Sequence, residues 1–154
     1  MDTVVEQWRR ERPDLDTRAL ATVGRLMRVA ELADVALARG LADYELPPGW
    51  FDLLAALRRA GELNPGGLMQ TTLLSSGGMT KRLDRLENAG LVERRPDPTD
   101  RRGTLVRLTR RGRSITDRAV ERHIANEERL LEPLSAAERR TLDGFLRRLL
   151  QRLE

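Results

Sequence analysis

The sequence contains no cysteine, and its only histidine is His123, within the polar stretch 120–128. Disulfides, thiol nucleophiles and sulfur-ligated metals are therefore excluded. One histidine cannot supply the ligand cluster of a transition-metal site, and no pair of nucleophile and base can be recognised. We expect no enzymatic activity, no metal and no cofactor, and we expect His123 to be exposed to solvent.

Aromatic residues are also scarce, at 3% of the chain, and no apolar run reaches the roughly 18 residues that a membrane-spanning helix needs. The first 14 residues are charged, unlike a signal peptide. These features predict a cytoplasmic protein with no membrane partner. The apolar fraction of 40% suffices for an aliphatic core, and 154 residues suit one compact domain with helical extensions.

Positive charge is concentrated in one part of the chain. The net charge is +4, but the segment 77–113 alone holds eleven basic and five acidic residues, a net +6. Such a patch favours a polyanionic partner such as nucleic acid. Because Lys81 is the only lysine, a solvated surface in an arginine-rich protein remains the alternative. The patch lacks the aromatic side chains on which single-stranded RNA bases stack, which favours duplex DNA.

The two ends of the chain are patterned as long amphipathic helices. A short helix stops at Pro13, and the segment 16–44 then repeats apolar residues at helical spacing. About 25 helical residues span roughly 35 to 40 Å, more than a small domain can cover. The segment 110–134 and a last helix, opened by a capping box at Ser135, frame the other end. Exposed apolar stripes of this kind predict a homodimer.

The middle of the chain predicts a winged helix-turn-helix. A helix over 50–61 is followed by two short helices over 64–90, joined by a tight Ser/Gly turn. Two strand-like runs then flank the turn-rich loop 96–103 and form a hairpin, or wing. The expected fold is mainly α with a small β-hairpin wing (α+β), with long N- and C-terminal dimerisation helices. We expect dimerisation helices at 1–45 and 113–154 and the DNA-binding part at 46–112.

The second short helix is the expected recognition helix, which would enter the major groove of DNA. Met79, Leu83 and Leu86 share its core face, and Lys81 and Asp84 lie opposite. Arginines at the wing tip are suited to the negative potential of a narrow minor groove. Alternatively, the segment 75–78 is only a loose turn and the segment 100–102 an ordinary charged turn, without DNA contacts. The expected DNA-binding residues are Ser75, Ser76, Gly77, Thr80, Lys81, Arg82, Asp100, Arg101 and Arg102.

The stretch 75–113, SSGGMTKRLDRLENAGLVERRPDPTDRRGTLVRLTRRGR, resembles the MarR family of winged-helix transcriptional regulators. The helical frame on both sides also fits, so the resemblance covers nearly the whole chain. It implies a homodimer joined through its terminal helices, and a regulator, usually a repressor, that binds palindromic operators. It also implies that a small ligand releases the DNA. A winged-helix protein-interaction module without a ligand is the alternative.

A narrower resemblance joins VEQWRRERPDLD, residues 5–16, to the urate-responsive branch of that family. It implies a ligand site made by Trp8, Asp52 and Arg85. An asparagine of that site has no counterpart eight residues after Asp52, where Ala60 stands. The effector is therefore urate or another small ligand, phenolic or carboxylate. Alternatively, Trp8 is dimer packing and Asp52–Arg85 a structural ion pair.

Overall fold

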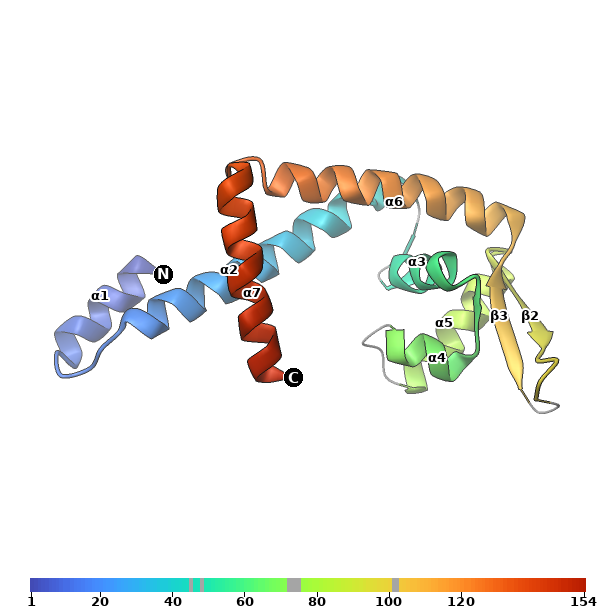
Figure 1. Ribbon diagram of the computed structural model, residues 1–154, viewed down its shortest axis with the longest axis horizontal. Coiled ribbons are helices and arrows are strands. Elements are labelled where there is room, and N and C mark those ends of the chain that lie inside the picture. The colour runs from blue at the N-terminus through green and yellow to red at the C-terminus, as the bar shows by residue number, and fades with distance from the viewer. Residues whose placement is uncertain (45, 48, 72–75, 101–102) are drawn as a thin grey trace. The chain divides into compact units, whose positions relative to one another are not determined.

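The computed structural model describes residues 1–44, 46–47, 49–71, 76–100 and 103–154. They form a mainly helical protein with one small antiparallel sheet, which confirms the expected fold class (Figure 1). The chain divides into two units, 1–39 and 40–154. Within the residues described, no helix is both long enough and apolar enough to cross a membrane.

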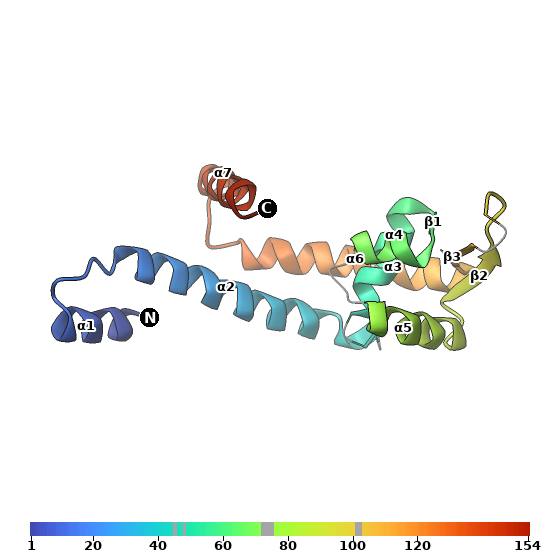
Figure 2. The same cartoon turned by 90° about the horizontal axis from the view of Figure 1, so that it is seen from below.

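The first unit is a helical hairpin. Helix α1 (Asp2–Glu11) ends before Pro13 and turns back alongside the start of α2 (Arg18–Gly40), as Figure 2 shows. Val5 is the buried residue of α1. The flexible Met1 side chain lies over Gly24, where a Cβ would be 2.1 Å from the Met1 methyl carbon. The hairpin is thus held by a few apolar contacts and by an ion pair between Arg25 and Asp2.

Helix α2 has no buried residue, although much of it is apolar. The side chain of Met27 is 68% exposed and that of Val29 64% exposed. Leu20, Val23, Leu26, Leu32 and Val35 are exposed as well. So many exposed aliphatic side chains are unusual for a soluble monomer.

The second unit contains the winged helix. After the short 3-10 helix Ala42–Tyr44 come α3 (Trp50–Ala60), α4 (Pro65–Thr71) and α5 (Ser76–Asn88). Gly61 ends α3 at a φ of +81°, and the Asn64 side chain caps α4 by accepting from the Gly67 N–H at 2.7 Å. These helices enclose an aliphatic core: Leu53, Leu54, Leu57, Leu68, Met79, Leu83, Leu86 and Val106.

The wing is an antiparallel hairpin of β2 (Val92–Pro96) and β3 (Thr104–Leu108). Gly90, at a φ of +66°, ends α5 just before it. A third strand, β1 (Glu62–Leu63), pairs with β3 and makes the sheet order β1-β3-β2. The sequence did not lead us to expect β1. A two-residue strand has no periodicity to detect, and its pairing partner lies more than 40 residues away.

Two helices complete the second unit. Helix α6 (Arg110–Leu130) begins at Thr109, whose hydroxyl accepts from the Gly112 N–H at 2.9 Å, and it packs on α3. Helix α7 (Ala136–Leu153) opens with the expected capping box between Ser135 and Glu138. No residue of α7 is buried. Its apolar residues Leu142, Phe145, Leu149, Leu150 and Leu153 are exposed.

The expectation that His123 is solvent-exposed was wrong. Its side chain is 23% exposed, and its ring lies 4.6 Å from that of Phe51, centroid to centroid. The cause is the packing of α6 on α3. Asn126, almost one turn further along α6, is buried with its side chain against Gly40. The sequence around His123 is polar and therefore predicted an exposed helix face. The packed face of α6 nevertheless includes a polar residue, Asn126.

Candidate nucleic-acid interface

Helix α5 separates apolar and polar residues onto opposite faces, as the expected recognition helix should. Met79 and Leu83 are at most 2% exposed, whereas Thr80 and Lys81 are exposed. Ser76 and Gly77 lie in the first turn of the helix, and Ser75 lies outside the described residues. The structure therefore presents the polar face of α5 to solvent, and the DNA contacts of these residues stay predictions.

Arg82 differs from its neighbours because it reaches the start of α3. Its guanidinium carbon lies 3.3 Å from the point that a Cβ on Gly49 would occupy. Gly49 adopts a φ of +79° and precedes α3 without a side-chain cap. Arg82 is thus half-buried beside the helix whose first turn carries Asp52. The sequence pattern did not reveal that Arg82 lies beside the start of α3, the helix that carries the expected ligand residue Asp52.

Three arginines of the basic segment are paired with carboxylates of their own chain. Arg94 pairs with two carboxylates of α5, Arg95 with Glu62 of β1, and Arg107 with Glu93 across the hairpin. The hydrogen bonds from Arg95 also lower the pKa of the Glu62 carboxyl. Asp84, Glu87 and Glu93 are already counted in the net +6 of the segment 77–113, whereas Glu62 lies outside the segment and offsets one further positive charge.

The wing loop is braced by its own polar groups. The Asp97 carboxylate accepts from the Thr99 N–H at 2.8 Å and from its hydroxyl at 2.7 Å, and these bonds lower the pKa of Asp97. The Gly103 N–H donates to the Asp100 carbonyl at 2.8 Å. Arg101 and Arg102 lie outside the described residues, so their contact with a minor groove stays a prediction.

The expected ligand residues lie in different units. Trp8 is on α1 of the first unit and is 46% exposed, while Asp52 and Arg85 are exposed in the second. Among the described residues no ion pair joins Asp52 to Arg85. A common site of the three residues stays a prediction.

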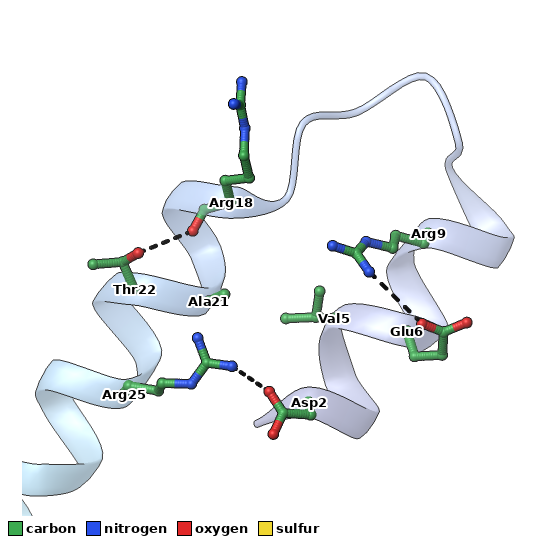
Figure 3. Close-up of a pocket in the computed structure, with 8 residues that line it drawn as sticks. All are labelled: Asp2, Val5, Glu6, Arg9, Arg18, Ala21, Thr22 and Arg25. Atoms are coloured by element: carbon green, nitrogen blue, oxygen red, sulfur yellow. Dashed lines mark hydrogen bonds and ion pairs between the residues drawn. The ribbon is translucent and has the colours of Figure 1, made fainter.

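The first unit has an open groove between α1 and α2 (Figure 3). Arg25 and Asp2 close one end of it, and Arg9 lies near Glu6. Val5 points into the gap between the helices. Trp8 does not line this groove, so the groove is not the expected ligand site. In the described part of the chain no cluster of acidic or histidine side chains could hold a metal ion.

Comparison with known proteins identifies the family to which this winged helix belongs. A MarR-family model matches residues 44–103. The HTH-type transcriptional regulator PecS of Dickeya dadantii is 40% identical over 148 residues, covering 94% of this chain and 89% of PecS. The chain belongs to the MarR family. It is a DNA-binding transcriptional regulator of that family, as its sequence resemblance predicted.

Solved structures of the MarR family agree with the fold. A mutant MarR from E. coli, complexed with operator DNA, aligns with a TM-score of 0.76 at 31% identity, covering 87% of this chain and 97% of that one. BpsR of Bordetella bronchiseptica, whose DNA binding is regulated by 6-hydroxynicotinic acid, aligns with a TM-score of 0.73 at 26% identity, covering 82% and 91%. Both similarities cover more than four fifths of this chain.

Proposed function

We propose that this MarR-family regulator binds a palindromic operator as a homodimer, represses transcription there, and releases the DNA when a small planar anion such as urate binds. The observation that carries the proposal is the exposed polar face of α5, beside a braced wing. Thr80 and Lys81 lie on that face, and the opposite face of α5 is apolar and packs against the core. Lys81 has no ion-pair partner among the described residues, so its charge is available to phosphate.

The homodimer is supported by the two helices that lack buried residues, α2 and α7. Each presents aliphatic side chains to solvent within its own chain, and a twofold-related copy offers a matching surface. In such a dimer the two recognition helices read successive major grooves about 34 Å apart. A mutant MarR from E. coli, which aligns over 87% of this chain, is solved in complex with operator DNA and supports DNA binding by this fold.

The effector is proposed from the chemistry of three residues. Trp8 offers a flat ring for stacking on a planar heterocycle, and Arg85 a planar donor fork for an anionic edge. Asp52 can accept from ring N–H groups. Arg82, held at the start of α3, is a second cation of α5 that a ligand near Asp52 could meet. BpsR, which responds to a planar carboxylate, supports the ligand class, so a phenolic compound or small carboxylate remains the alternative to urate.

Replacement of Arg102 by alanine is expected to weaken operator binding about tenfold without unfolding, because each protomer loses one minor-groove arginine. Gel shifts over a range of salt concentrations measure the operator affinity of the variant. The slope of log K against log salt should become shallower by about 1.8, since two phosphate-region charges disappear per dimer. Arg122→Ala, at an exposed position of α6, is the control and should change neither quantity. An unaltered affinity in Arg102→Ala would remove the wing from the interface.

Urate is expected to dissociate the operator complex, and Trp8→Ala and Arg85→Ala are each expected to raise the urate concentration required by about tenfold. Loss of one stacking or bidentate contact corresponds to roughly 1 to 2 kcal/mol. Each variant is compared with its own ligand-free affinity, because Arg85 lies on the recognition helix. A normal urate response in both variants rules out this pocket. A thermal-shift series with urate, xanthine and small carboxylates then identifies the effector class.

A further inference from the structure

Two consecutive arginines of β2 leave the strand on opposite sides, as successive side chains of an extended strand do. Arg95 reaches β1, where its Nε donates to Glu62 Oε2 at 2.9 Å. Arg94 reaches the recognition helix α5 instead. Both arginines therefore tie the wing to elements outside the hairpin, and the Arg94 contact connects the two parts of the expected DNA-binding surface.

Arg94 spans two carboxylates that lie one helical turn apart on α5. Its Nη2 donates to Asp84 Oδ1 at 2.7 Å and its Nη1 to Glu87 Oε2, while its backbone N–H donates to Glu87 Oε1 at 3.3 Å. The side chain is only 28% exposed. A planar guanidinium held by two acceptors on one helix face has few orientations open to it.

The charge of Arg94 is retained in this setting. Burial disfavours the charged form, but the hydrogen bond to Asp84 and the attraction of Glu87 outweigh burial, so the pKa of the guanidinium lies above its ordinary value. Arg94 is thus fully engaged by protein groups, unlike a side chain held free for phosphate.

We propose that Arg94 is a positioning residue for DNA binding: through Asp84 and Glu87 it fixes the wing relative to the recognition helix, so that both enter neighbouring grooves as one body. The proposal rests on the proposed function, in which α5 and the wing both contact the operator. A wing that is free to swing must be ordered when DNA binds, and that ordering weakens the complex. We call these three residues the wing clamp.

Substitution of Glu87 tests the wing clamp because charge alone predicts the opposite result. Glu87→Ala removes a negative charge near DNA, which by itself should tighten binding. Loss of the clamp should instead weaken binding about fivefold, a coupling of ordinary size for contacting residues. Glu93→Ala is the matched control: it also removes one glutamate paired with a wing arginine, but the Glu93–Arg107 pair lies within the hairpin. Glu93→Ala should bind as tightly as the unaltered protein or more tightly.

A second variant changes no charge. Arg94→Lys keeps the cation but cannot span both carboxylates, and it should also weaken binding about fivefold. Its salt slope should become shallower, toward that of Arg102→Ala, because a loosened wing also loses most of the Arg102 contact. Circular dichroism and thermal melts establish that each variant is folded at the temperature of the binding measurement.

A double-mutant cycle with Arg102 separates failure of the clamp from failure of the wing contact. If Arg94 positions the wing, Arg102→Ala should weaken the Arg94→Lys protein less than threefold, against about tenfold in the unaltered protein, because a loosened wing already contributes little. In the Glu93→Ala background the full tenfold loss should remain.

Two results would overturn the clamp: Glu87→Ala binding as tightly as Glu93→Ala, or additive effects of Arg94→Lys and Arg102→Ala. If Arg102→Ala alone has no effect on operator affinity, the wing does not contact the operator. That part of the proposed function then fails, and the wing clamp fails with it.

Discussion

Leu149→Asp is expected to convert the dimer into a monomer and to reduce operator affinity at least a hundredfold. Leu149 lies on the exposed apolar face of α7 and makes no buried contact within its own chain. A carboxylate there leaves the fold of one chain intact, but a dimer would have to bury two unpaired charges, which costs several kcal/mol. Without the dimer, each half-site must be bound separately, and the gain from linking two contacts is lost.

Light scattering after gel filtration gives the oligomeric mass, and gel shifts on the same fractions give the affinity. Gln151→Asp is the matched control, because it adds one acid to α7 on the opposite face of the helix. It should remain a dimer with unaltered affinity. A dimeric Leu149→Asp protein with normal DNA binding would show that the apolar face of α7 serves some other contact.

Features that depend on local chemistry were predictable from the sequence. Gly61 and Gly90 end their helices at positive φ, and Asn64 and Ser135 provide the expected caps. These outcomes follow from sterics and hydrogen bonds within a few residues, which a short stretch of sequence specifies. The core face of α5 was equally accessible, because helical periodicity alone determines it.

Features that depend on distant pairing were not predictable. Arg95 meets Glu62 across 33 positions of sequence, through a strand too short to recognise. The eleven basic residues of 77–113 therefore looked like one patch, although Arg94, Arg95 and Arg107 are paired internally. Arg82 was assigned to DNA on charge alone, and only the structure shows it turned toward α3. Charge counting locates a candidate interface but does not say which charges are free.

Gly112→Ala is expected to destabilise the protein by about 3 kcal/mol or more, or to prevent folding, because the site has no room for a side chain. A Cβ at Gly112 would lie 1.8 Å from the Leu91 carbonyl oxygen, and the obstacle is backbone rather than a side chain that could move. Urea denaturation at one fixed protein concentration measures the effect, since dimer stability depends on concentration.

The start of α6 cannot retreat to relieve this clash. The Thr109 N–H donates to the Leu91 carbonyl at 3.1 Å, and the Thr109 hydroxyl donates to the Gly90 carbonyl at 2.7 Å. Moving α6 outward together with Thr109 would break both bonds, and moving it without Thr109 would break the cap on Gly112. Gly144→Ala is the control, because nothing lies within 4 Å of its Cβ position, and alanine there should stabilise α7 by about 0.5 to 1 kcal/mol. Equal stability of the two variants would mean that the contact between α6 and the end of α5 is looser than the structure shows.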